Sequence, residues 1–412
     1  MGGDISRESL SHSGKSSSSS LMPPFSRRSA FFFCIANFLC WVGLYLYVPI
    51  LPVHVQSAGG SLYLVGTVVA AYAIPQVLLR IPIGVWSDSM GRHKPLVAIG
   101  MAVASLGALG LGLSADPWLM FLSRMTTGIG AAAWVVFSIY FTSYYLPEDS
   151  GKAIGLINFV QGGALVAATA GGGAIADALG ARPTFYIAAL LGASALLALL
   201  FSKERFPSKA KAISWRSFSS IATRPILITV SIMGIMLQFS IFAGLFGFVP
   251  VYAAQIGASH TDLGFITTIN LGCSSAGSLM SVWLSERLGY RATIIWGALL
   301  IGGSLFAIPF ILQVPALMAL QISYGLGRGI LMTILMALSI RDVSHEHRAT
   351  AMGIFQAIYS IGMLAGPLVS GFLGDRLGLS SVFSLAASVS ILVAALAFLP
   401  LFSKHRSMLP NQ

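Results

Sequence analysis

Apolar residues along this chain gather into twelve long stretches, which short polar segments separate. Each stretch holds about 20 residues or more, and a helix of that length, rising ~1.5 Å per residue, crosses ~30 Å of hydrocarbon. The pattern therefore predicts twelve membrane-spanning helices. Their expected ranges are 29–53, 62–86, 95–114, 117–145, 153–176, 183–202, 225–249, 262–285, 291–312, 315–340, 349–374 and 380–402.

The second half of the chain repeats the first at a constant interval of 198 residues. Glu286 follows Asp88 at this interval, and the run from Gly371 to Phe383 matches the run from Gly173 to Phe185 at several positions. A register without gaps indicates two homologous halves, an arrangement common among transporters. We expect an all-α membrane protein of two pseudo-symmetric six-helix bundles, 29–202 and 225–402, with a linker over 203–224, a disordered tail over 1–28 and a short tail over 403–412.

The composition supports a membrane protein. Hydrophobic residues make up 56% of the chain and charged residues 9%, whereas soluble domains carry about a quarter charged residues. The net charge of +11 could indicate a nucleic-acid partner, but its distribution does not. If both ends are cytoplasmic, 19 of the 24 lysines and arginines lie on the inner side and only Arg182 and Arg376 in outer loops. This asymmetry follows the positive-inside rule, so we expect both ends in the cytoplasm and no nucleic-acid partner.

Nothing in the sequence indicates an enzyme. The three cysteines, Cys34, Cys40 and Cys273, fall inside apolar segments without metal-ligand spacing. No phosphate-binding loop or nucleophile–base arrangement is present. We therefore expect no enzymatic activity, no metal and no cofactor.

The polar turn after the second apolar segment carries a recognisable motif. Residues 84–94 read GVWSDSMGRHK, and this spacing resembles the loop 2–3 signature of the major facilitator superfamily. On this resemblance the chain is identified as a member along nearly its whole length. The residues that carry the motif are Gly84, Asp88, Gly91, Arg92 and Lys94, and a weaker copy in the second half consists of Glu286, Gly289 and Arg291.

Other segments resemble the twelve-helix drug:proton antiporter branch of that superfamily. Gly43, Pro49 and Pro52 are similar to its first-helix motif, and Arg124 belongs to a fourth-helix motif linked with proton coupling. The fifth-helix motif is degraded, with Ala168-Thr169 where a glycine–proline pair is usual. The resemblance implies alternating access, in which Asp88 docks against the start of the eleventh helix, near 349–352, when the inner side is closed.

Small residues indicate where helices pack closely. Membrane helices have little hydrophobic drive to associate, so close contact requires small side chains on the facing surfaces. The fifth and eleventh helices carry such residues, and the positions that we assign to helix packing are Gly172, Gly173, Gly366 and Pro367.

The candidate substrate site consists of charged, polar and aromatic residues inside the apolar segments. Arg80, Arg124 and Arg328 are embedded, whereas every acidic residue falls in a tail, a loop or a segment end. An intramembrane arginine costs at least ~2.5 kcal/mol on insertion scales, which points to a functional role. Asn37, Trp41 and Tyr45 share one face of the first helix. The remaining candidates are Gln76, Gln238, Asn270, Gln321, Tyr324 and Gln356.

These observations leave several functions open. The first is secondary active transport of a small molecule across the cytoplasmic membrane, with proton-coupled efflux as the expected form. The second is uptake or facilitated exchange of a small organic anion, which the embedded arginines and the missing embedded carboxylate favour. A non-transporting membrane sensor is a third, although it would need an extra domain or a broken gate motif. We expect a monomer whose partners are the lipid bilayer, a small-molecule substrate and, as a coupling ion, the proton.

Overall fold

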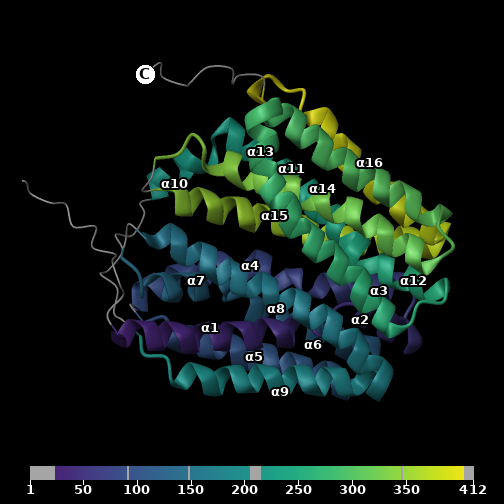
Figure 1. Ribbon diagram of the computed structural model, residues 1–412, viewed down its shortest axis with the longest axis horizontal. Coiled ribbons are helices and arrows are strands. Elements are labelled where there is room, and N and C mark those ends of the chain that lie inside the picture. The colour runs from purple at the N-terminus through teal and green to yellow at the C-terminus, as the bar shows by residue number, and fades with distance from the viewer. Residues whose placement is uncertain (1–23, 91, 147–148, 205–214, 345–346, 403–412) are drawn as a thin grey trace, which may run out of the picture.

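The computed structural model describes residues 24–402 except 91, 147–148, 205–214 and 345–346. All regular elements within these ranges are helices, so the predicted all-α fold is confirmed (Figure 1). In the first half the helices are α1 Pro24–Tyr45, α2 Leu51–Ser57, α3 Leu62–Ala71, α4 Ala73–Met90, α5 Lys94–Leu113, α6 Pro117–Ala132, α7 Trp134–Thr142, α8 Ser150–Leu179 and α9 Ala181–Leu200.

The described part of the linker contains one short helix, α10 Trp215–Ala222. The helices of the second half are α11 Pro225–Ala243, a π-helical stretch over Gly244–Phe248, α12 Val249–Gln255, α13 His260–Ala307, α14 Val314–Ile340, α15 Arg348–Leu377 and α16 Leu379–Leu396. Helix α1 starts at Pro24, so the last five residues of the tail predicted over 1–28 lie in this helix. The short tail predicted over 403–412 lies outside the described residues.

Eleven helical segments of the described chain are long and apolar enough to cross a membrane. The twelfth is concealed in α13, a continuous assignment of 48 residues that would extend ~72 Å if it were straight, more than twice the hydrocarbon thickness. At Gly289 the backbone adopts φ 80° and ψ 167°, a conformation that strongly favours glycine, and the helix breaks there. The eighth and ninth predicted spans therefore lie on either side of Gly289.

Proline residues interrupt the first span of each half. The span predicted over 29–53 divides into α1 and the short α2, and Pro52 occupies the first turn of α2. The span predicted over 225–249 covers α11 and the π-helical stretch, and α12 then begins at Val249 with Pro250 in its first turn. Proline donates no backbone hydrogen bond and is favoured in the first turn of a helix, where its missing N–H group needs no intrahelical acceptor, and each of these short helices begins one residue before its proline.

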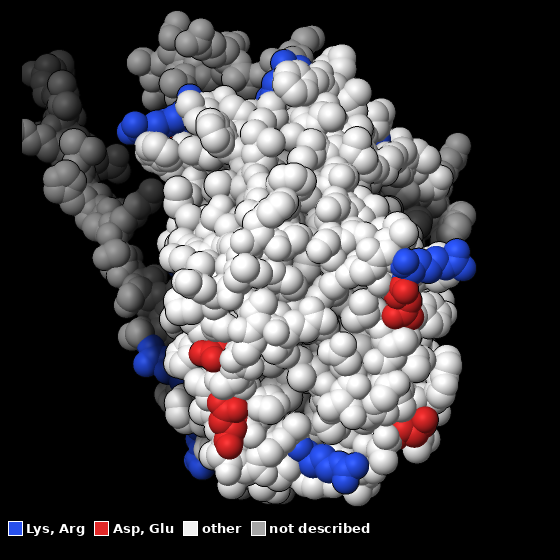
Figure 2. All heavy atoms as spheres, turned by 90° about the vertical axis from the view of Figure 1, so that its right-hand side faces the viewer, with Lys and Arg blue, Asp and Glu red and all other residues white. Residues whose placement is uncertain are grey.

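The helices of each half form a separate bundle, and the two bundles lie side by side (Figure 1). In that view α1 starts at the left and the yellow end of the described chain lies at the top, left of centre; we call this side the terminal face. The short helices α2 and α12 lie at the right, on what we call the opposite face. Figure 2 views the molecule from that side, where a few acidic and basic side chains are scattered over a mostly uncharged surface.

The bundles meet through two equivalent helix pairs. Helix α15 of the second half packs on α3, and α8 of the first half packs on α13. A side chain on Gly371 would lie 2.6 Å from the Leu62 carbonyl oxygen, and one on Gly264 would lie 2.5 Å from that of Thr169. Glycine at these positions lets the two backbones touch, because no side chain separates the helices.

Candidate functional site

The centre of the molecule contains three embedded arginines from both halves. Arg80 lies on α4, Arg124 on α6 and Arg328 on α14. Each guanidinium stands over at least one aromatic ring, and none forms an ion pair with a carboxylate of the described residues. The arrangement is therefore a positively charged centre whose cations are held mainly by aromatic rings and neutral polar groups.

Arg124 is the most enclosed of the three, with 5% of its surface exposed. Its Nη1 donates to the Tyr47 hydroxyl at 3.0 Å, and its Cζ lies 4.3 Å from the ring centroid of Tyr72. Cation–π contacts of this kind are worth ~2 kcal/mol or more when they are desolvated. These contacts hold Arg124 within the first half, but its Nε has no hydrogen-bond partner in the described structure.

Arg80 is held by its own helix and by a ring from the other half. Its Nη2 donates to Gln76 Oε1 at 2.5 Å, and the Gln76 amide nitrogen donates to the Tyr72 carbonyl oxygen at 3.2 Å. The guanidinium lies 5.8 Å from the ring centroid of Tyr359 on α15. Both Nε and Nη1 of Arg80 are buried without a described partner, so this group retains donors for a ligand or for water.

Arg328 is the charged residue that the second half contributes. Its Nη1 donates to Asn270 Oδ1 at 3.3 Å, and Asn270 Nδ2 donates to Gln321 Oε1 at 3.1 Å. Its Cζ lies 5.7 Å from the ring centroid of Phe246, in the π-helical stretch. A single long hydrogen bond uses one of the five guanidinium N–H donors, so most of the capacity of Arg328 remains available.

Aromatic rings of α1 connect this arginine to the first half. The Tyr45 ring lies 6.2 Å from Phe246 and 5.9 Å from Trp41, and Trp41 in turn contacts Trp134 at 5.3 Å. Tyr45 is within electrostatic reach of both Arg124 and Arg328. Residues from α1, α6 and α14 therefore meet at one place between the two bundles.

Several buried polar atoms near this centre have no described partner. Asn37 is fully buried, yet neither its amide oxygen nor its amide nitrogen is hydrogen-bonded; the same holds for Trp41 Nε1 and Gln321 Nε2. Buried polar groups are almost always paired, and an unpaired one costs ~1–3 kcal/mol. Such atoms at a positively charged centre are those that a polar ligand would satisfy.

The remaining candidates of the substrate site form no described hydrogen bond with the three arginines. Tyr324 is fully buried and donates to the Ser240 carbonyl oxygen at 2.9 Å, which ties α14 to α11. Gln238 is buried in α11, and Gln356 is partly buried in α15. Sequence reasoning missed the rings of Tyr47 and Phe246, because residue spacing does not reveal which aromatic of another helix faces a given arginine.

The gate motif of the first half is only partly described. The side chain of Asp88 and the whole of Gly91 lie outside the described residues, whereas Gly84 is partly buried in α4 and Arg92 is exposed. Lys94 Nζ donates to the Leu200 carbonyl oxygen at 3.3 Å and to that of Ser202 at 2.5 Å, at the end of α9. Within the described structure, these contacts of Lys94 remain inside its own bundle.

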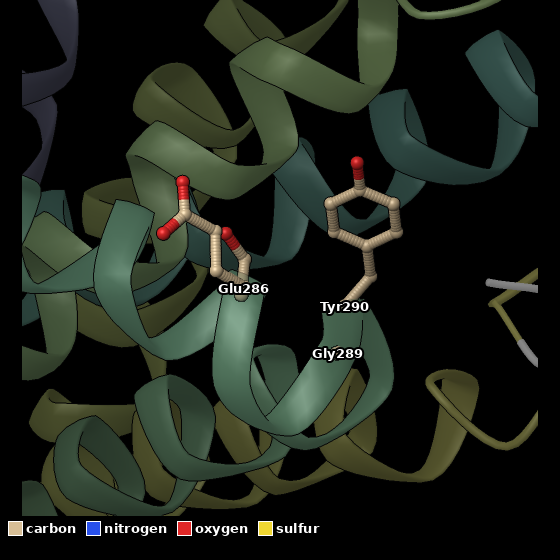
Figure 3. A pocket seen from close by; sticks show the side chains of 4 residues that line it. Glu286, Gly289 and Tyr290 are labelled. Carbon is tan, nitrogen blue, oxygen red and sulfur yellow. The ribbon is translucent and has the colours of Figure 1, made fainter. Parts of the chain in front are cut away.

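The second copy of the motif has the same organisation. Arg291 donates from Nε to the Ala397 carbonyl oxygen at 3.1 Å and from Nη2 to that of Phe398 at 2.9 Å, just after α16. Glu286, Gly289 and Tyr290 line a shallow open hollow, and Figure 3 shows the side chains of Glu286 and Tyr290 rising on the same side of the turn at Gly289. The Glu286 carboxylate accepts no hydrogen bond from any described residue, so this acid is exposed to solvent on the terminal face.

The four positions assigned to helix packing lie in tight contacts. A side chain on Gly172 would collide with the Leu46 carbonyl oxygen of the same bundle, and one on Gly173 with that of His260 in the other bundle. A side chain on Gly366 would collide with the Phe239 carbonyl oxygen, and Pro367 is the residue against which Gly66 packs. Gly172 and Gly366 thus face their own bundle, whereas Gly173 and Pro367 face the opposite half.

The known proteins to which this chain is similar are transporters. The chain is 22% identical over 383 residues to an uncharacterized MFS-type transporter of Methanocaldococcus jannaschii, covering 90% of this chain and 98% of the relative. It is 26% identical over 384 residues to the multi-drug resistance efflux pump PmrA of Streptococcus pneumoniae, covering 88% and 94%. A bacterial homolog of the human lysosomal transporter Spinster, solved in an inward-facing and unoccupied conformation, superposes with a TM-score of 0.81 at 17% identity and covers 94% of this chain and 99% of that one.

The family model described as Major Facilitator Superfamily matches residues 33–256 and again residues 237–408. The two matches together cover nearly all of the described chain, and they overlap over residues 237–256. With its repeated halves, its central site between them and these relatives, the chain belongs to the Major Facilitator Superfamily.

Proposed function

We propose that this protein is a secondary transporter that exports a small organic molecule with a negatively charged group by alternating access. The observation that carries the proposal is the central cluster of Arg80, Arg124 and Arg328, to which no described carboxylate is paired. The kinship with PmrA, named as a multi-drug resistance efflux pump, supports the outward direction.

The energetics of the central arginines favour an anionic ligand. An unpaired cation in a low-dielectric site is costly, and a carboxylate or phosphate of the substrate would form charge-assisted hydrogen bonds with the free guanidinium donors. Arginine is suited to this role because its planar fork binds such groups through two parallel bonds. The rings of Tyr45, Trp41 and Phe246 would accommodate an apolar or aromatic part of the same molecule.

The division of the cluster between the halves fits alternating access. Arg328 belongs to the second bundle, whereas Arg80 and Arg124 belong to the first. A ligand that contacts both bundles can favour the conformations in which the two arginine sets are close, because only differential affinity shifts a conformational equilibrium. The site therefore couples occupancy to the relative position of the bundles.

The distribution of charge supports an orientation with both ends in the cytoplasm. With both ends in the cytoplasm, 19 of 24 basic residues lie on the inner side. The terminal face would then be cytoplasmic and the opposite face external. The two helix pairs between bundles meet at the opposite face, whereas the exposed Glu286 hollow lies at the terminal face.

Transport by purified protein tests the proposal. Proteoliposomes would be loaded with a library of organic anions, neutral molecules and cations, and release would be followed by mass spectrometry with and without a pH gradient. We expect selective release of anions, and a dependence on the pH gradient if protons are coupled. Equal release of cations and anions, or movement of cations only, would overturn the anionic assignment while leaving the transport function intact.

A further inference from the structure

Two carboxylates bridge the bundles at the opposite face. Asp375 lies in the last turn of α15, and its Oδ1 accepts the backbone N–H of Leu62 at 2.8 Å while its Oδ2 accepts that of Tyr63 at 3.1 Å. Leu62 and Tyr63 are the first two residues of α3, in the other half. We call this contact the first latch.

The same contact recurs in the other direction. Asp177, near the end of α8, accepts the backbone N–H of His260 at 3.0 Å through Oδ1 and that of Thr261 at 2.8 Å through Oδ2. These are the first two residues of α13, again in the opposite half. We call this the second latch. All three of its residues lie 198 positions from their counterparts in the first latch, so the two form a pseudo-symmetric pair.

The N-termini of α3 and α13 each leave two backbone N–H groups for an acceptor from the other bundle. The first turn of a helix leaves N–H groups without intrahelical acceptors. Ser61 caps α3 by accepting the N–H of Leu64, and Ser259 caps α13 by accepting that of Asp262. Each serine serves the third residue of its helix, and the first two N–H groups are left for the carboxylate of the opposite half.

We propose that Asp177 and Asp375 are gating residues of the transporter, whose paired contacts hold the opposite face closed and must break before the bundles can part there. Gly371 and Gly173, which pack against the other bundle, lie about one helical turn before Asp375 and Asp177. The latches therefore lie at the end of the closely packed contact between the bundles. A carboxylate at a helix N-terminus gains both charge-assisted hydrogen bonds and the favourable helix dipole. Opening exchanges these contacts for water, which makes the latches contributors to the closed state alone.

The two latches differ in one respect. His260 occupies the position of Leu62, and its Nδ1 lies 3.0 Å from Asp177 Oδ1. The His260 side chain thus adds a contact to Asp177 that Leu62 cannot supply to Asp375.

Spin-label distances across the opposite face test the latches. One label on Ser57 and one on Gln255 report on the two bundles, since both residues are exposed and occupy equivalent ends of α2 and α12. Cys34, Cys40 and Cys273 would first be replaced by serine. In liposomes, we expect the Asp177→Asn/Asp375→Asn double variant to raise the ratio of open to closed distances about tenfold or more, because each variant loses a charged hydrogen bond.

The matched control is Asp116→Asn. Asp116 also accepts two N–H groups at a helix start, from Trp118 at 2.9 Å and Leu119 at 3.2 Å, but within its own bundle. This variant should leave the distance distribution unchanged. An unchanged distribution in the double variant, or a shift no larger than that of Asp116→Asn, would overturn the proposal. If the double variant does not fold, each single variant should give a smaller shift in the same direction, and no shift in either would count against the latches.

The measurement does not depend on the substrate. A shift in distances together with failure of anion transport would leave the latches standing and refute the proposed substrate class. Selective anion transport without any shift would do the reverse.

Discussion

Replacement of Arg328 by alanine is the most direct test of the central site. The change removes the arginine that the second half contributes to the central site, together with its hydrogen bond to Asn270 and its contact with Phe246. It leaves in place the bond between Asn270 and Gln321, which does not involve the guanidinium. The local structure therefore retains part of its support when the charge is removed.

The expected magnitude follows from the contacts that a substrate anion would lose. A hydrogen bond to a charged group contributes ~1.5–3 kcal/mol, which corresponds to a ~10- to 150-fold increase in Kd. Arg328→Lys retains the charge but loses the planar fork, so we expect an intermediate Kd, about three- to tenfold above that of the wild type. Transport should fall in the same order.

The assay would measure Kd and thermal stability on the same purified samples, with the anion that gives the largest flux as the probe. The matched control is Arg287→Ala, which removes an exposed arginine standing 4.7 Å from the Trp283 ring. Weakened binding with an unchanged Tm supports the anion site. A lowered Tm in Arg328→Ala with unchanged affinity would indicate that Arg328 only stabilises the bundle. Normal binding and transport in Arg328→Ala would refute the reasoning, and a neutral or cationic substrate would become the better hypothesis.

Three further predictions address orientation, the inner gate and the second latch. In intact cells, a single cysteine at position 210 should be protected from an impermeant thiol reagent, whereas one at position 58 should react with it. The reverse pattern would invert the topology. Asp88→Asn should lower transport with normal abundance, since a contact of ~1–3 kcal/mol shifts populations several-fold, and full activity would contradict the gate. His260→Leu should raise the share of open distances in the spin-label assay, because it removes the Nδ1 contact with Asp177 that the first latch lacks; an unchanged distance distribution would exclude a role for the histidine.

The sequence alone determined the number and order of the membrane helices. Span length depends on local apolar composition, and the 198-residue repeat revealed the two bundles without any contact information. The turns were also readable, because Gly180, Gly289 and Gly378 adopt positive φ at the ends of the predicted segments. These are local properties, and each depends on a few neighbouring residues.

Only the tertiary structure decided which groups meet. Lys94 belongs to a gate motif, yet its described contacts lie at the end of α9. Asp177 and Asp375 fall inside the repeated runs 173–185 and 371–383, but nothing in the sequence indicates their role. The aromatic partners of the arginines come from other helices, at sequence separations that no periodicity encodes. The physical reason is that a hydrophobic pattern specifies which residues leave water, whereas the partner of a buried charge depends on how separate helices pack around it.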